Sequence, residues 1–129
     1  EEFVRYTSPL TAITRKCPHA AKLVDQDVPA GGRVGICWPS ANRDETVFDK
    51  PNEVVLDRSP NPHIGFGFGA HNCLGAPHAR LIFRSLLKSL CNRVERLELV
   101  HAEPKIEKES SFTRQNGYEV VTVKLHAKK

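Results

Sequence analysis

Apolar side chains recur at helical spacing through residues 76–92, and this is the clearest element that the sequence predicts. The set comprises Ile82, Phe83, Leu86, Leu87, Leu90 and Cys91. Residues three and four positions apart lie on the same side of an α-helix, so the set forms one wide apolar face. Pro77 stands in the first turn, where proline is tolerated. Residues 1–6 predict the end of another helix, which stops before Pro9.

Alternation of apolar and polar residues predicts strands elsewhere in the chain. The segments concerned are 11–16, 94–100 and 118–125. The segment 21–38 predicts a β-hairpin whose two arms flank the turn Pro-Ala-Gly-Gly at 29–32. The pair Asn116-Gly117 directly precedes the last strand and is typical of a type I′ hairpin turn.

The middle of the chain predicts less regular structure. Ser40 is a suitable N-cap for a short helix within 40–48. Residues 49–65 carry three prolines among scattered polar residues and predict a long irregular segment, which tends to be functional in a compact chain. We found no internal repeat. The pattern therefore predicts an α+β chain with one dominant helix and small antiparallel sheets.

Composition narrows the class of protein. The chain has 129 residues, 40% of them hydrophobic and 26% charged, which suits one folded domain with its own core. No apolar run is long enough for a membrane span, and no signal peptide opens the sequence. The net charge of +4 is spread along the chain except for the final "HAKK", which disfavours a nucleic-acid-binding arm and allows a mildly basic surface for an acidic protein partner.

The four cysteines lack CxxC spacing. A disulfide framework is therefore not expected, and a reducing cytoplasm is the expected setting. The sequence contains no methionine and opens on "EEFVRY", which has the pattern of a helix without an N-cap. We therefore expect a part of a longer polypeptide, with removal of an initiator methionine as the alternative.

Residues 65–75, "GFGFGAHNCLG", carry the candidate chemistry. Cys73 falls just before the predicted helix, where unpaired N–H groups and the helix dipole stabilise a thiolate. The glycines allow close backbone approach to a ligand, and Phe66 and Phe68 can screen the sulfur from water. This pattern suits a nucleophile or a metal ligand. The alternative is a glycine-rich turn around a buried, inert cysteine.

The spacing Phe66-x-x-Gly69-x-x-x-Cys73-x-Gly75 resembles the haem-ligating signature of the cytochrome P450 superfamily, the haem-thiolate monooxygenases. Glu2-x-x-Arg5 resembles the superfamily's other signature helix. The segments "RYTSPLTAITR", "SANRDETVF" and "RSPNPHIGFGFGAHNCLGAPHAR" resemble soluble bacterial members in the same order. The resemblance covers nearly the whole chain and is weakest beyond residue 100.

The resemblance implies a role for several residues. It implies that Cys73 ligates the iron of haem b, iron protoporphyrin IX, and that Phe66 shields the sulfur. It implies that Gly67 and Gly75 let the loop lie against the porphyrin. The residues that it aims at the haem propionates are Arg15, His63 and His71, whose charge-assisted bonds suit anionic groups.

Other residues match structural and substrate-contacting positions of the family. The resemblance implies that Glu2, Arg5 and Arg58 form a buried charge triad that pins the segment 49–65 under the haem. It implies that Thr11, Ala12 and Ile13 line the substrate pocket, together with the turn around 114–117. Arg43 belongs to a recurring "NRD" piece, and we assign it no chemistry.

The sequence also departs from the family pattern. Nothing in it corresponds to the family's central helix, whose acid–alcohol pair handles protons during oxygen activation. His78 stands where leucine is common, and Ile82 where glutamate is common. His78 either alters the surface offered to a redox partner or is a solvated helix residue.

The leading interpretation is the C-terminal, haem-binding portion of a cytoplasmic cytochrome P450, comprising residues 1–129, without the N-terminal helical part. The resemblance implies an electron donor of the ferredoxin or flavoprotein type and a small organic substrate, with neither nucleic acid nor membrane as a partner. Basic residues of the long helix would dock an acidic ferredoxin; they are Arg80, Arg84 and Lys88.

Two alternatives remain open at the level of sequence. One is a non-catalytic haem-binding module, whose exposed apolar surface would favour oligomers. The other is a zinc site built from "CPH" at 17–19 and "HNC" at 71–73, although these spacings fit no common zinc module.

Overall fold

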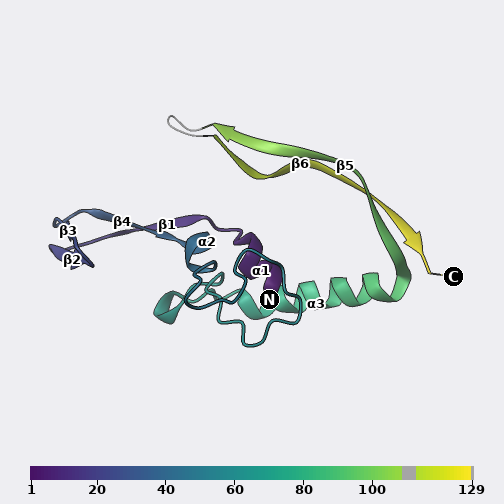
Figure 1. The fold of residues 1–129 in the computed structure, drawn as a ribbon, viewed down its shortest axis with the longest axis horizontal. Coiled ribbons are helices and arrows are strands. Elements are labelled where there is room, and N and C mark those ends of the chain that lie inside the picture. Colours follow the sequence, from purple (N-terminus) through teal and green to yellow (C-terminus); the bar gives the residue numbers. More distant parts are fainter. Residues whose placement is uncertain (109–112, 129) are drawn as a thin grey trace. The chain divides into compact units, whose positions relative to one another are not determined.

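The computed structural model describes residues 1–108 and 113–128, and it divides into two compact units. The first unit is Glu1–Leu74 and the second is Gly75–Lys129. Figure 1 shows the first unit as short elements joined by long loops, and the second as one long helix and one long hairpin. The α+β class with a dominant helix and small antiparallel sheets agrees with the sequence-based prediction.

The first unit begins with α1, Glu2–Thr7, which confirms the helix predicted before Pro9. The residue that caps its C-terminus, Ser8, adopts the left-handed conformation with φ of 40°. Strand β1, Ala12–Lys16, follows and pairs antiparallel with β4, Arg33–Cys37. The pairing places Ile13 opposite Ile36, so that two β-branched side chains meet on this ribbon.

The predicted pairing within 21–38 is wrong. Its first arm folds back on itself as β2, Ala21–Leu23, and β3, Gln26–Val28, around a turn at Val24 and Asp25. The second arm is β4, which pairs with β1 instead. The glycines at 31 and 32 do not join two paired arms: the Gly31 N–H donates to the Cys17 carbonyl at 2.7 Å, which brings β4 beside β1.

The next segment is mostly irregular. Helix α2, Trp38–Ala41, begins two residues before Ser40. The prediction that Ser40 is an N-cap is therefore wrong, because Ser40 lies inside the helix. Pro39 in its first turn explains the earlier start, because proline fits there without losing a hydrogen bond. Residues 49–65 contain neither helix nor strand, which confirms the predicted irregular segment. The short 3₁₀ helix η1, Gly69–His71, precedes Cys73.

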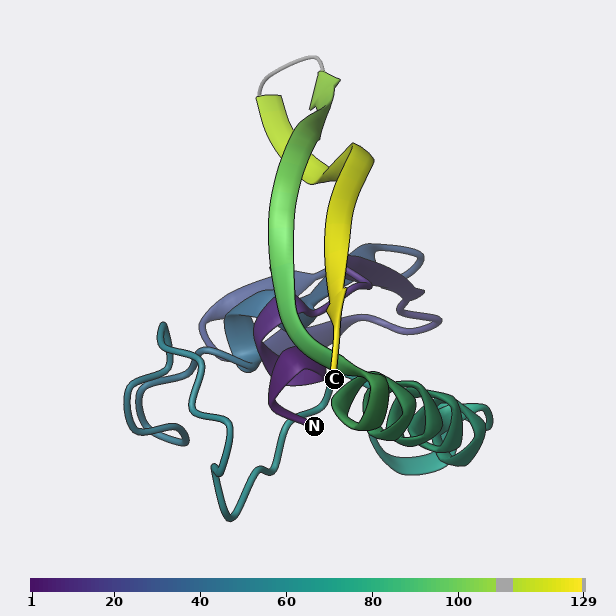
Figure 2. The ribbon, with the colours of Figure 1, turned by 90° about the vertical axis from the view of Figure 1, so that its right-hand side faces the viewer.

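The second unit contains three elements. Helix α3, Ala76–Arg93, confirms the predicted helix and carries Pro77 in its first turn. Strands β5, Val94–Lys108, and β6, Thr113–Ala127, pair antiparallel and are both longer than predicted. Figure 2 shows the β5–β6 ribbon as a long, twisted two-stranded arm.

The pair Asn116-Gly117 is not a hairpin turn. Both residues lie within β6, where the register passes from Ile106–Gln115 to Pro104–Tyr118. Two residues of β6 therefore face a single residue of β5, Lys105, which is a β-bulge. Gly117 has φ of 78°. The prediction failed because a bulge and a type I′ turn both require glycine in the left-handed region.

Few hydrophobic residues are buried in the part of the chain that the structure describes, so the apolar core is small. The buried hydrophobic residues are Trp38, Phe48 and Ala76, whereas the buried polar and charged residues are Glu2, Arg5, Ser8 and Asn42. The predicted apolar face of α3 is at least half-exposed at Phe83 and Leu86. The interior of the first unit is therefore built mainly from charged and polar groups.

The cysteines and the lengths of the helices bear on the class of protein. All four cysteines are free, as their spacing predicted. Within residues 1–108 and 113–128, α3 and the other helices are too short or too polar to cross a bilayer.

Candidate functional site

The buried guanidinium of Arg5 organises the first unit. Arg5 is 0% exposed and has five N–H donors. Two of them bind the carboxylate of Glu2 at 2.7 and 2.8 Å. The other three bind the backbone carbonyls of Asn42, Pro51 and Glu53 at 2.8 to 2.9 Å. Every donor of this cation is satisfied, which is what makes its burial tolerable.

The carboxylate of Glu2 accepts bonds from three further groups. The Nε–H of Arg58 lies 3.1 Å from both of its oxygens. The backbone N–H of Val55 donates at 2.9 Å and the amide of Asn61 at 3.0 Å. We call Glu2, Arg5 and Arg58 the charge hub, since these three side chains meet at one carboxylate.

The charge hub shifts the ionisation of its members. Hydrogen bonds from Arg5 first, and from Val55 and Arg58, together lower the pKa of Glu2 to about 2 against the opposing effect of burial. The hydrogen bonds to Glu2 raise the pKa of Arg5. Glu2 therefore stays ionised at neutral pH, and the hub is a structural element rather than a source of protons.

The charge hub fixes the irregular segment. Arg58 also donates to the carbonyl of Asp49 at 2.6 Å and that of Lys50 at 3.3 Å. The ring of Phe48 lies under two cations, with its centroid 5.3 Å from the Arg5 guanidinium carbon and 5.8 Å from that of Arg58. In segment 49–58, hydrogen bonds to polar side chains thus take the place of helix or strand bonds.

The segment that carries Cys73 is a tight double turn. The Gly67 N–H donates to the Ile64 carbonyl at 2.8 Å, and the Cys73 N–H donates to the Phe66 carbonyl at 2.6 Å. Gly67 has φ of 80°, and a Cβ there would lie 3.0 Å from the His71 carbonyl oxygen. The turn therefore requires glycine at position 67 on grounds of both conformation and space.

A cavity of about 510 Å³ opens beside this turn within Glu1–Leu74. Its size falls in the range typical of small-molecule and cofactor sites. It brings together seven residues that were proposed from the sequence: Ile13, Arg15, Phe66, Gly67, Phe68, His71 and Cys73. Pro9, Leu10, Ile36, Trp38 and Gly65 complete the lining.

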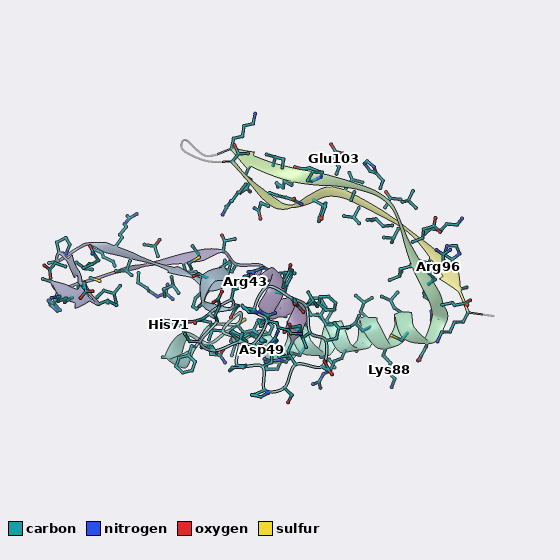
Figure 3. All side chains as sticks on the ribbon, viewed as in Figure 1. Arg43, Asp49, His71, Lys88, Arg96 and Glu103 are labelled. Atoms are coloured by element: carbon teal, nitrogen blue, oxygen red, sulfur yellow. The ribbon has the colours of Figure 1, made fainter. Side chains whose placement is uncertain are left out.

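Each wall of the cavity comes from a different element. Ile13 and Arg15 stand two positions apart on β1, so both face the same side, and Ile36 joins them from β4. Phe66 and Cys73 come from the double turn. His71, labelled in Figure 3, ends η1 and is exposed. The cavity therefore combines one thiol, two basic side chains and largely apolar walls.

Other proposed residues lie outside this cavity lining. They are Thr11, Ala12, His63 and Gly75. His63 Nε2 lies 2.7 Å from a carboxylate oxygen of Glu1, and its Nδ1 accepts the Gly65 N–H at 3.2 Å. The imidazole is 3% exposed. His63 is thus engaged by Glu1 in this structure, and a contact with another anion would require that pair to open.

The turn proposed around residues 114–117 belongs to the second unit. Arg114 binds Glu107 across the strands at 2.9 Å, and the Asn116 amide binds the same carboxylate at 2.6 Å. These bonds lower the pKa of Glu107, with Asn116 as the largest cause. The proposed contact segment is therefore a braced bulge in β6 rather than a turn.

The alternative of a zinc site would need a cluster of metal-ligating side chains. Among residues 1–108 and 113–128, no group of three or more His, Cys, Asp or Glu side chains is arranged to hold a metal ion. The segments 17–19 and 71–73 do not combine into one ligand set.

The sequence analysis missed three buried residues near the site. Asn42 and Phe48 anchor the irregular segment, and Trp38 lines the cavity. The Trp38 indole N–H is buried and has no hydrogen-bond partner in the part of the chain described. The recurring "NRD" piece was the available signal for Asn42. Its neighbour Arg43, labelled in Figure 3, donates to the Tyr6 carbonyl at 2.6 Å.

Comparison with known proteins gives one consistent family. The family model described as "Cytochrome P450" matches residues 1–122. Cytochrome P450 119 of Sulfolobus acidocaldarius is 40% identical over 125 residues, which is 97% of this chain and 33% of that protein. Putative cytochrome P450 126 of Mycobacterium tuberculosis is 43% identical over 118 residues, 92% of this chain and 27% of that protein.

A solved structure described as that of a carbohydrate active P450 is similar throughout. It is 44% identical, with a TM-score of 0.89 over 98% of this chain and 34% of its own. The chain thus spans about a third of the length of the proteins that it matches.

Proposed function

The chain belongs to the cytochrome P450 family, and from that premise we propose that residues 1–129 are the C-terminal, haem-binding portion of a haem-thiolate monooxygenase. The observation that carries the proposal is the cavity that unites Cys73 with Arg15, His71 and Phe66. A cysteine alone would carry no such weight. Its convergence with basic and aromatic side chains supports a flat, partly anionic ligand.

The residues present fit protohaem. Cys73 supplies the sulfur donor that the family uses, and the apolar walls suit a hydrophobic macrocycle. Arg15 and His71 supply basic partners for its two carboxylate arms. Gly67 keeps the backbone at this wall free of a Cβ. Haem bound here would supply dioxygen activation at its iron, which no side chain can perform.

The chain's own residues would hold and shield that group. Cys73, as a thiolate, would donate electron density, and Phe66 would keep water from the sulfur. Thr11, Ala12 and Ile13 would contact a small organic substrate, and among them Ile13 lines the cavity. Gly75 would allow close approach of the backbone, and His63 would reach a propionate only after leaving Glu1.

Partners form part of the same proposal. We expect a ferredoxin or flavoprotein donor to dock on the basic side of α3. Arg80, Arg84 and Lys88 stand four residues apart on one side of that helix, and Lys88 projects from it in Figure 3. Charge reversal at Arg84 and Lys88 would slow electron transfer most at low salt. We expect a cytoplasmic setting, with neither nucleic acid nor membrane as a partner.

A second candidate is a non-catalytic haem-binding module. Large apolar side chains on α3 and on the β5–β6 ribbon are about half-exposed, which favours association with further protein or with a second copy. The two candidates differ in dioxygen chemistry. Substrate-dependent oxygen consumption by the full native chain supports the monooxygenase, and haem binding without it supports the module.

The test of haem ligation is spectroscopic. The chain is loaded with haem, reduced and exposed to carbon monoxide, and a strongly red-shifted Soret band is expected from a thiolate ligand. Cys73→Ser should abolish that band. Cys37→Ser is the matched control, because Cys37 is an exposed cysteine of the same unit outside the cavity lining. A band that survives in Cys73→Ser would overturn the assignment.

A further inference from the structure

Asn42 connects the charge hub to the segment that carries Cys73. It is 0% exposed, and its backbone carbonyl accepts an N–H from Arg5 at 2.9 Å. Its side-chain amide donates to the hydroxyl of Ser8 at 2.9 Å, and its side-chain oxygen accepts the Ile64 N–H at 2.9 Å. Because a backbone N–H can only donate, the atom that faces Ile64 must be the amide oxygen.

From Ile64 the contacts continue to Cys73. The Ile64 carbonyl accepts the Gly67 N–H and closes the first turn of the double turn. The Phe66 carbonyl, inside that turn, accepts the Cys73 N–H at 2.6 Å. The backbone at Cys73 is therefore held through the turn that Asn42 anchors at its first residue.

We propose that Asn42 is a positioning residue for Cys73: its amide oxygen fixes the Ile64–Gly67 turn, and that turn fixes the direction of the cysteine backbone. The inference rests on the proposed function, in which Cys73 is the haem ligand. Asn42 is not one of the residues that line the cavity, and although its backbone N–H donates to the Trp38 carbonyl, its side chain bonds Ser8 and Ile64, so the side chain acts on Cys73 through the backbone.

The amide oxygen and the amide N–H group of Asn42 bond different residues, so the two bonds can be removed separately and their effects compared. Asn42→Leu has similar size but leaves the partly buried Ile64 N–H without its side-chain acceptor. Asn42→Asp keeps an oxygen toward Ile64 and should rescue the turn. Ser8→Ala removes the hydroxyl that accepts the N–H of the Asn42 amide. Ser8 is buried like Asn42, and the bond from Ile64 to Asn42 stays in place.

The experiment measures two quantities in the full native chain. The first is amide hydrogen exchange of residues 64–73, which reports the turn whether or not haem is bound. We expect roughly tenfold faster exchange in Asn42→Leu and near-native exchange in Asn42→Asp and Ser8→Ala. The second is the Soret band of the reduced carbon monoxide complex, in which Asn42→Leu should lose thiolate character.

The outcomes separate the two proposals. Native exchange at 64–73 in Asn42→Leu overturns the positioning role. So does an equal loss of thiolate character in Ser8→Ala, because the effect would then follow general destabilisation. If the unmodified chain shows no thiolate band but Asn42→Leu still accelerates exchange, haem ligation fails while the anchoring of the turn stands.

Discussion

The backbone of residues 49–65 in the first unit is held largely by polar side chains, whereas α3, β5 and β6 in the second unit are held by backbone-to-backbone hydrogen bonds. The charge hub binds the backbone of five residues in 49–58: Asp49, Lys50, Pro51, Glu53 and Val55. The β5–β6 pair instead runs through a long register of cross-strand partners. Irregular backbone needs buried polar side chains because it has no ladder of its own.

The β5–β6 ribbon of the second unit separates apolar and charged side chains onto two faces. On the β5–β6 ribbon, Leu97 pairs with Leu125 and Leu99 with Val123, while the intervening Glu98 pairs with Lys124. The strands therefore present one apolar and one charged face. Figure 3 shows Arg96 and Glu103 as labelled side chains on the same strand, β5. We expect mutations to be costly in the first unit and mild in the second.

The largest expected effect is in the charge hub. Arg5→Met leaves Glu2 buried with fewer partners, and we expect a loss of about 3–5 kcal/mol in the free energy of unfolding. Denaturant titration followed by the fluorescence of Trp38, the only tryptophan of the sequence, measures it. Lys50→Gln is the control, since the Lys50–Glu53 pair is 3.9 Å apart and more than 60% exposed, and it should change little. Equal effects would refute the special role of the hub.

A slightly smaller difference in the free energy of unfolding is expected between variants at two apolar sites, one in each unit. Phe48→Ala removes a side chain that is 3% exposed beneath two guanidinium groups, and should cost about 3 kcal/mol. Leu86→Ala on α3 removes one that is 50% exposed, and should cost about 1 kcal/mol. Thermal unfolding of both variants tests the contrast. A more costly Leu86→Ala would mean that α3 is covered in solution.

Acid should weaken the first unit more than the second. The pKa of Glu2 falls from 4.5 to about 2 on folding, so the stability that it supplies is complete above pH 4.5. That stability, about 3 kcal/mol, is lost as the pH falls toward 2. Trp38 fluorescence measured from pH 6 to pH 2 follows it. Glu2→Gln should flatten this dependence, and an unchanged profile in that variant would contradict the assignment.

The smallest effect is expected at the bulge of β6. Gly117→Ala places a Cβ at φ of 78°, where nothing lies within 4 Å, so the cost is conformational alone and should be about 1 kcal/mol. Hydrogen exchange of residues 113–127 reports it. Gly35→Ala on β4 also has nothing within 4 Å, has no left-handed φ and should be nearly neutral. Similar behaviour of both variants would argue against the bulge.

Much of the local structure was predictable because it follows from local pattern. The spacing of Leu86, Leu87 and Leu90 predicts α3, and the three prolines predict the irregular segment. The pairing of 21–38 was wrong, because the partner of β4 is β1, which lies outside that segment. Nothing local to Arg33–Cys37 distinguishes one antiparallel partner from another.

By itself the sequence determined the cysteine and its glycine-rich turn, because the spacing of Phe66, Gly69 and Cys73 is a property of one continuous segment. The helix α3 and the family resemblance follow in the same way from local order. Only the tertiary structure decided that Arg5 satisfies backbone carbonyls more than 30 residues away, and that Asn42 anchors Ile64. A buried polar group must find its partner in space, and distance along the chain does not restrict which residue that is.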